Sequence, residues 1–129
     1  MNGRFLLDTN IVIALFAEDT SVQKGLMEAE QVFVPSIVLG ELYYGARKSL
    51  RTQENIARVD EFAAISAVLV PNIATAKKYG EIKNALRNKG RPIPENDIWI
   101  VAITKQYGLT LVTRDEHFKE VEGITMEAW

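Results

Sequence analysis

Four acidic residues carry the chemistry that this sequence offers most clearly: Asp8, Glu41, Asp97 and Asp115. Carboxylate oxygens are the ligands that Mg²⁺ and Mn²⁺ prefer, whereas a zinc site is disfavoured because the chain has no cysteine and one histidine. Bound magnesium keeps several waters, one of which can become a nucleophile while the ion neutralises an attacked phosphodiester. If the four side chains meet, they predict metal-assisted phosphoryl chemistry without a covalent intermediate.

Short apolar runs alternate with helical patterns along the chain. The runs predict strands at residues 5–7, 32–34, 67–70, 109–112 and 123–126. The patterns predict helices at 11–16, from the turn at 18–21 to about 30, 36–48 with Ser36 as N-cap, 52–65, 73–88 and 97–107. Strands that are apolar on both faces and alternate with helices are typical of a parallel sheet between helix layers. We therefore predict one α/β domain over residues 1–129, a three-layer α/β/α sandwich with a short, mainly parallel central sheet.

This fold brings the four acids to one edge of the sheet. Asp8 directly follows the first predicted strand, and Asp115 follows the strand at 109–112 after two loop residues. Glu41 lies in the second turn of the helix after the second strand. Asp97 opens the apolar helix that leads into the strand at 109–112. In a right-handed crossover the helix begins near the carboxyl edge of the sheet, where ligands bind in such folds. We expect all four carboxylates near that edge.

Each acid also has a structural alternative. Asp8 and Asp115 could be turn or capping residues, and Asp97 could be a first-turn acid that complements the helix dipole. Glu41 falls on the helical stripe that faces the protein, where a carboxylate is costly unless a cation or donor meets it. Its alternative is a buried ion pair with an arginine.

Four segments that contain these acids resemble the motifs of PIN-domain proteins, and most of all those of the VapC-type toxins of toxin–antitoxin pairs. The segments are Leu6-Leu7-Asp8-Thr9-Asn10, Ser36-Ile37-Val38-Leu39-Gly40-Glu41-Leu42, Asn96-Asp97-Ile98-Trp99-Ile100-Val101-Ala102 and Leu111-Val112-Thr113-Arg114-Asp115-Glu116-His117-Phe118. The resemblance runs in the right order from Phe5 to about Phe118. All four motif acids are present, so nothing suggests an inactive enzyme.

The resemblance implies an endoribonuclease that uses Mg²⁺ or Mn²⁺ and a metal-activated water. By position, Asp8 and Asp97 would be the main metal ligands, while Glu41 and Asp115 would complete the cluster and hold or activate the water. Asn10 and Thr113 would orient the carboxylates. The resemblance also implies a homodimer and a small antitoxin that buries a segment along the toxin and blocks the site with a basic side chain.

The charges of the chain are segregated. The net charge is −2, but residues 47–91 hold ten basic and four acidic residues, against five and thirteen elsewhere. Part of this basic segment is either a solvated helix face or a surface for RNA phosphates, and for the second role we name Lys83, Arg87 and Lys89. The absence of a signal-peptide pattern and of a run of about 20 apolar residues predicts a soluble, cytoplasmic protein that does not enter membranes.

Two other classes of protein are disfavoured, because the chain lacks the acidic residues that they need. A dehalogenase-type phosphatase needs a second acid two residues after the first, where this chain has Asn10, and a receiver domain needs an aspartate after its third strand, where this chain has Pro71-Asn72. The single histidine, His117, is predicted to be a structural cap. Two alternatives stay open: a non-catalytic PIN-like module that binds RNA or a partner, and a nuclease that processes RNA or acts on DNA without an antitoxin.

Overall fold

The structure, a computed structural model, describes residues 3–129. Its strands are β1 (Arg4–Leu7), β2 (Gln31–Pro35), β3 (Ala67–Leu69), β4 (Thr110–Val112) and β5 (Thr125–Glu127). Its helices are α1 (Thr9–Phe16), α2 (Thr20–Glu28), α3 (Ser36–Arg47), α4 (Thr52–Ile65), α5 (Ile73–Lys89), α6 (Glu95–Tyr107) and the 3₁₀ helix η1 (Glu116–Glu120). No helix in this part of the chain is long and apolar enough to cross a lipid bilayer.

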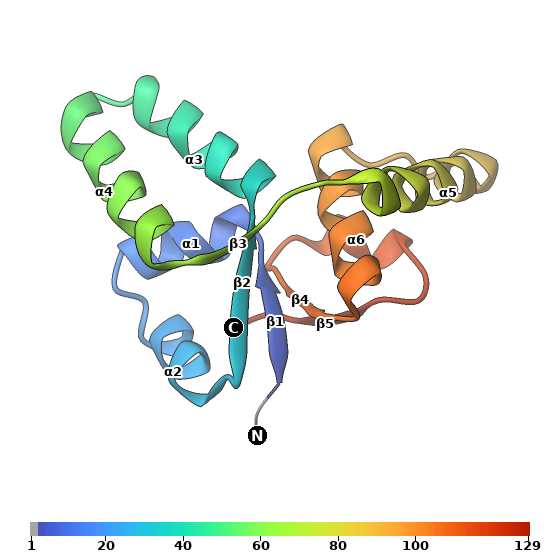
Figure 1. Ribbon diagram of the computed structural model, residues 1–129, viewed down its shortest axis with the longest axis horizontal. Coiled ribbons are helices and arrows are strands. Elements are labelled where there is room, and N and C mark those ends of the chain that lie inside the picture. The colour runs from blue at the N-terminus through green and yellow to red at the C-terminus, as the bar shows by residue number, and fades with distance from the viewer. Residues whose placement is uncertain (1–2) are drawn as a thin grey trace.

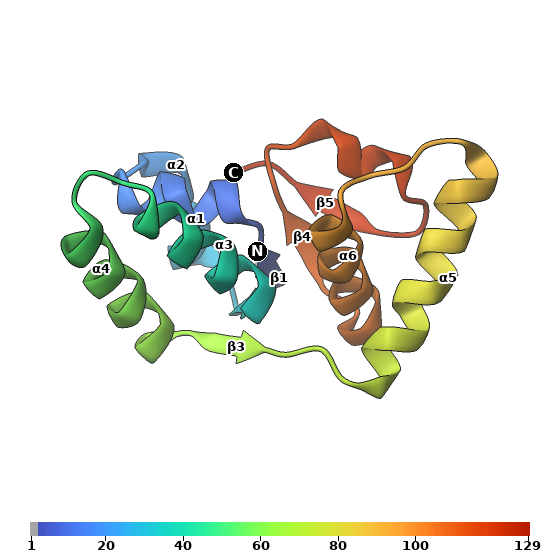
Figure 2. The same cartoon turned by 90° about the horizontal axis from the view of Figure 1, so that it is seen from above.

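The five strands form one parallel sheet in the order β3-β2-β1-β4-β5. From β1 the chain first adds β2 and β3 on one side, and then crosses β1 to add β4 and β5 on the other. Helices α1 to α4 lie to one side of β1 and β2, while α5 and α6 lie to the other (Figures 1 and 2). The predicted three-layer α/β/α architecture is therefore confirmed. The reversal of strand order creates a switch point between the carboxyl ends of β1 and β4, which is where ligands bind in such sheets.

The core is built around β1 and α6. Leu6 and Leu7 of β1 are at most 1% exposed, and Ile100, Val101 and Ile103 of α6 are fully buried. Since helices cover both faces of the central strands, these strands are continuous apolar runs, and α6 is apolar nearly all round because it is enclosed on all sides. This packing fixes the end of β1 and the first turn of α6.

Two helices begin two residues earlier than predicted, and both differences affect acidic residues. Helix α1 begins at Thr9 because Asp8 is its N-cap, with the Asp8 carboxylate accepting a hydrogen bond from the Thr9 backbone N–H. Helix α6 begins at Glu95 directly after a proline, so Asp97 lies inside the first turn instead of opening the helix.

One further local prediction was wrong, and one short element was not predicted. Ser36 is the first residue of α3 rather than its N-cap, because the extended Pro35 occupies the cap position and makes no side-chain cap bond. The 3₁₀ helix η1 was not predicted, since five residues are too short to show a helical hydrophobic period. This second difference changes the environment of His117.

Candidate active site

An open pocket of about 570 Å³ lies at the carboxyl edge of the sheet beside the switch point. It is lined by Asp8, Thr9, Asn10, Ile13, Glu41, Pro94, Glu95, Asn96, Asp97, Asp115 and His117. All four predicted acids therefore reach the same pocket, from β1, α3, α6 and the segment after β4. Residues more than 100 positions apart in the sequence meet here because β1 and β4 are neighbouring strands.

Asp8 is the most deeply buried of the four acids, with 4% of its surface exposed. Its Oδ1 accepts a hydrogen bond from the Thr9 N–H at 2.8 Å, and its Oδ2 accepts from Thr113 Oγ1 at 2.7 Å and from Asn10 Nδ2 at 3.1 Å. Burial raises the pKa of the Asp8 carboxyl, the charges of Glu41 and Asp115 add to this rise, and the hydrogen bonds from Thr113 and Thr9 oppose it. Asp8 is thus both a helix cap and an anion that the protein alone compensates poorly.

Thr113 and Asn10 connect the ends of β1 and β4. Besides donating to Asp8, the Thr113 hydroxyl accepts a hydrogen bond from the Asp115 N–H at 3.0 Å. The Asn10 carbonyl oxygen accepts one from the Arg114 N–H, also at 3.0 Å. These bonds set the direction of the Asp8 carboxylate and the path of the segment that carries Asp115, which is the geometry expected of residues that orient carboxylates.

Replacing Thr113 by valine should lower the cleavage rate about 10- to 100-fold, the usual cost of removing a group that orients a metal-binding carboxylate. Thr113→Ser keeps the hydroxyl and should retain most of the activity. Single-turnover cleavage rates of both variants, measured at saturating metal, check this expectation. Equal rates for the valine and serine variants would show that the hydroxyl does not contribute.

Glu41 is half-buried on α3 and is held by uncharged groups. Thr9 Oγ1 donates to its Oε1, and Asn96 Nδ2 lies 3.4 Å from its Oε2. Among residues 3–129 no lysine or arginine forms a salt bridge with Glu41, so the arginine pair considered as its structural alternative is not found. Sequence reasoning did not single out Thr9 and Asn96, although both adjoin motif acids and could have been found there.

Asp97 and Asp115 are joined by the ring of His117. The Nε2 atom of His117 contacts Asp97 Oδ2, and the Nδ1 atom lies 2.6 Å from Asp115 Oδ1. The prediction that His117 is a structural cap was wrong: Asp115 is the N-cap of η1 and accepts the His117 backbone N–H at 3.4 Å. The short helix turns the imidazole into the pocket instead.

Burial raises the pKa of Asp97 to about 6. The negative charges of Asp8 and Glu41 contribute to this rise, while the hydrogen bond from His117 opposes it. A carboxyl group with such a pKa is poorly compensated by the protein alone at neutral pH. A bound cation would supply the missing compensation.

Arg114 lies between two site residues in the sequence, but its side chain points away from the acids. Its guanidinium pairs with Asp19 at 2.9 Å and donates through Nε to the Trp129 carbonyl oxygen at 2.8 Å. The pocket thus keeps its net negative charge, and the loop between Thr113 and Asp115 is tied to the start of α2. The sequence pattern gave no signal of this contact.

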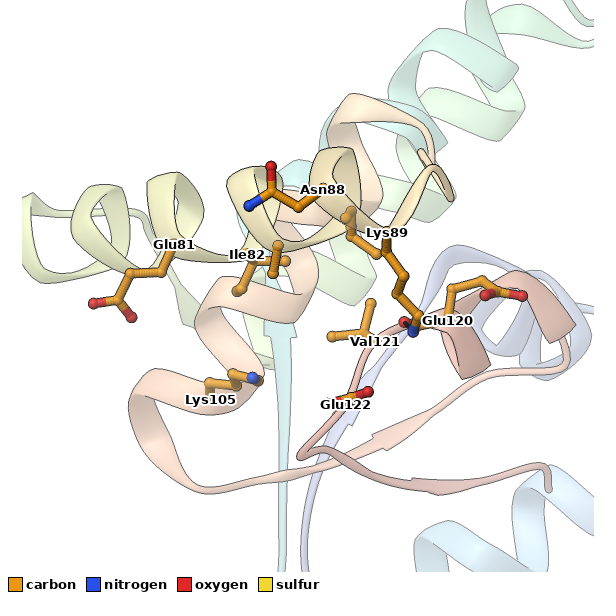
Figure 3. A pocket seen from close by; sticks show the side chains of 10 residues that line it. Glu81, Ile82, Asn88, Lys89, Lys105, Glu120, Val121 and Glu122 are labelled. Atoms are coloured by element: carbon orange, nitrogen blue, oxygen red, sulfur yellow. Dashed lines mark hydrogen bonds between the residues drawn. The ribbon is translucent and has the colours of Figure 1, made fainter.

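The three basic residues proposed for RNA lie on α5 and do not line the acidic pocket. Lys83 pairs with Glu95 at 2.8 Å, and Glu95 itself lines the pocket. Lys89 and Glu120 line a second cavity of about 560 Å³ (Figure 3). There Lys89 donates a hydrogen bond to the Glu120 carbonyl oxygen at 2.6 Å. Arg87 is exposed. A role of these residues in RNA binding stays a prediction.

The donor set of the pocket fits a hard divalent cation. Among residues 3–129 its lining offers five carboxylates (the four predicted acids and Glu95), the amide and hydroxyl groups of Asn10, Asn96 and Thr9, the imidazole of His117, and no lysine or arginine. One ligand atom from each of Asp97, Asp115 and His117 lies within 4.8 Å of the other two. Such a spacing allows several of these side chains to share one ion.

The profile of the PIN domain family matches residues 5–124, a range that contains all four acids. The chain belongs to the PIN-domain family. Within that family it is similar to VapC proteins over nearly its whole length. It is 35% identical to Ribonuclease VapC2 of Haemophilus influenzae and 33% identical to the tRNA(fMet)-specific endonuclease VapC of Shigella flexneri, and each match covers 98% of both chains.

Solved structures of VapC complexes share the fold of this PIN domain. The DNA-bound VapBC complex of Salmonella typhimurium contains a chain with a TM-score of 0.90 and 31% identity, with 98% of both chains covered. VapBC2 of Rickettsia felis bound to a promoter DNA fragment gives a TM-score of 0.88 and 29% identity, covering 100% of this chain and 99% of that one. The arrangement of five parallel strands and flanking helices is thus that of VapC-type PIN domains.

Proposed function

We propose that this PIN domain is a Mg²⁺- or Mn²⁺-dependent endoribonuclease that acts as the toxin of a toxin–antitoxin pair. The observation that carries the proposal is the meeting of four carboxylates from separate segments in one pocket whose lining, within the part of the chain that the structure describes, has no lysine or arginine. Relatives of 30–35% identity are named ribonuclease or tRNA endonuclease, which supports RNA as the substrate. Retention of all four acids argues against a non-catalytic binding module.

In this proposal Asp8 and Asp97 hold the divalent cation, with Glu41 and Asp115 completing the cluster. The bound ion would supply a water of lowered pKa and a positive charge for the attacked phosphate. Thr113 and Asn10 keep the Asp8 carboxylate in one orientation, and Thr9 does the same for Glu41. Glu41 or Asp115 would accept the proton of the attacking water as the water oxygen bonds to phosphorus; the bridging P–O bond would break with its electron pair on the leaving oxygen, which takes a proton from solvent.

Metal removal and restoration test the proposal. Protein treated with EDTA should not cleave bacterial tRNA, the first substrate to try given the name of the Shigella relative, and added Mg²⁺ or Mn²⁺ should restore cleavage. Equal cleavage with and without the metal would contradict the proposal. Cleavage of DNA instead of RNA would favour the alternative of a DNA nuclease.

An apolar groove next to the acidic pocket supports the proposed antitoxin partner. It has a volume of about 390 Å³, is lined by side chains of α1, α3 and α4, and shares Ile13 and Glu41 with the acidic pocket. A peptide segment that fills it would end beside the carboxylates. The VapBC structures, in which VapC proteins occur together with VapB, favour such a partner. A homodimer and a cytoplasmic location stay predictions.

Gly45 lines this groove and offers a test of antitoxin binding. A Cβ atom at Gly45 would meet nothing within 4 Å, so Gly45→Trp should fold and fill the groove. We expect inhibition by the cognate antitoxin to weaken about 10-fold or more, with unchanged cleavage by the free variant. Gly80→Trp on α5, where a Cβ is also unobstructed, is the matched control. Equal inhibition of both variants would exclude the groove.

A further inference from the structure

His117 directs both of its ring nitrogens at acids of the pocket. Nδ1 lies 2.6 Å from Asp115 Oδ1, and Nε2 contacts Asp97 Oδ2. Within residues 3–129 these are the polar contacts of the ring, and neither is made to a backbone carbonyl or to a group outside the pocket. The imidazole is therefore part of the same cluster as the four carboxylates.

The position of the imidazole is set by the protein around it. Phe118, which is fully buried, stacks on the ring with centroids 4.8 Å apart and planes 28° from parallel. Asp115 caps the 3₁₀ helix from which the ring projects. Packing and capping hold the ring in the pocket, so its orientation does not depend on the two carboxylate contacts alone.

This arrangement matches the way in which proteins prepare a histidine for a metal ion. A metal-binding imidazole almost always donates its other ring N–H to a carboxylate or carbonyl, which fixes the tautomer and the ring direction. Without a metal, Nε2 donates to Asp97; when a cation binds between Nε2 and Asp97, the Nδ1–H can still donate to Asp115 and the Nε2 lone pair is available to the ion. The spacing of 4.8 Å or less among the three ligand atoms allows Nε2 and Asp97 to reach a common ion.

We infer that His117 binds the divalent cation through Nε2 next to Asp97, while Asp115 orients its ring. The inference rests on the proposed metal-dependent function and changes the ligand set from oxygen alone to oxygen and nitrogen. Imidazole is a better ligand for transition metals than for Mg²⁺, which prefers oxygen. The site therefore favours Mn²⁺ over Mg²⁺.

Calorimetric titration separates a ligand from a mere counter-ion. His117→Gln keeps an N–H donor for Asp115 but loses the imidazole nitrogen. Its affinity for Mn²⁺ should fall about 10-fold or more, while its affinity for Mg²⁺ should change much less. If His117 only neutralises the acids and competes with the metal, the variant will bind both ions more tightly, which would overturn the inference.

Pulsed electron paramagnetic resonance of bound Mn²⁺ tests the bond directly. His117 is the only histidine in the chain, so selective ¹⁵N-histidine labelling marks this residue alone. Wild-type protein loaded with Mn²⁺ should show a directly coupled imidazole nitrogen that changes from ¹⁴N to ¹⁵N on labelling and is lost in His117→Gln. Lys119→Gln on the same 3₁₀ helix, an exposed position, should keep the coupling.

The outcomes distinguish this inference from the function on which it rests. Bound manganese without nitrogen coupling in the wild type would overturn the role of His117 and leave an oxygen-ligated nuclease site intact. Failure of the wild type to bind Mn²⁺ or Mg²⁺ at all would overturn both. Nitrogen coupling that survives in His117→Gln would show that the coupled nucleus is not in this side chain, and would also overturn the inference.

Discussion

Asp8→Asn should reduce RNA cleavage by about 1,000-fold or more, because a metal-held water and the neutralised phosphate together contribute several kcal/mol to the transition state. The variant should fold normally. An asparagine has almost the shape of aspartate, and its carbonyl oxygen can still accept hydrogen bonds from Thr113 or Thr9. The loss would therefore come from the missing charge rather than from a rearranged pocket.

The same substitution should raise the melting temperature of the metal-free protein. Burial and the neighbouring acids make the ionised Asp8 carboxylate unfavourable when no cation is bound, and asparagine removes that charge. Asp60→Asn on α4 is the control, since Asp60 is exposed and outside the pocket, and its cleavage rate should be that of the wild type. Wild-type cleavage by Asp8→Asn would overturn the assignment of the metal site.

Asp97→Asn should change the pH dependence of stability. Burial raises the pKa of Asp97 to about 6 in the folded protein, compared with about 3.9 in an unfolded chain. The folded state therefore binds this proton more tightly. The resulting stabilisation is complete below about pH 4 and is lost as the pH rises through 6.

Urea unfolding of the metal-free protein at pH 5 and pH 7.5 measures this effect. Between these two values, Asp97 should make the wild type about 1 kcal/mol less stable at the higher pH, and the asparagine variant should lack this loss. The free energy of unfolding of the variant, minus that of the wild type, should therefore be larger at pH 7.5 than at pH 5. Saturating Mn²⁺ should stabilise the wild type more than the variant, because it binds the folded state. A difference between the two proteins that is the same at both pH values would contradict the pKa assignment.

The elements that carry the acids could be predicted because their signals are local. Asp8 directly follows an apolar run, which reflects burial of β1 on both faces. The mostly apolar helix that carries Asp97 ends at Gly108, which adopts the left-handed C-cap conformation. The handedness of crossovers then places the acids at one edge without knowledge of the strand order. The order itself, with β4 beside β1, could not be predicted in the same way, because it depends on packing between segments that are distant in the sequence.

The surroundings of individual side chains were harder to predict, since their partners lie far away in the sequence. His117 meets Asp97, 20 residues earlier, because an unpredicted 3₁₀ helix turns its ring inward. From the sequence, Lys83 and Lys89 were predicted to be available to RNA phosphates. In the structure Lys83 forms a salt bridge with Glu95, and Lys89 donates a hydrogen bond to the Glu120 carbonyl oxygen. Periodicity identifies the face of a helix but not the contacts made on it.

Cleavage of total bacterial RNA by wild-type protein and by Asp8→Asn, each with Mn²⁺, with Mg²⁺ and with EDTA, tests the central claim most directly. Sequencing of the cut ends would identify the target. We predict discrete fragments that require both the metal and Asp8. The same fragments from the Asp8→Asn variant or in EDTA would contradict a nuclease whose acidic pocket works through a bound metal ion.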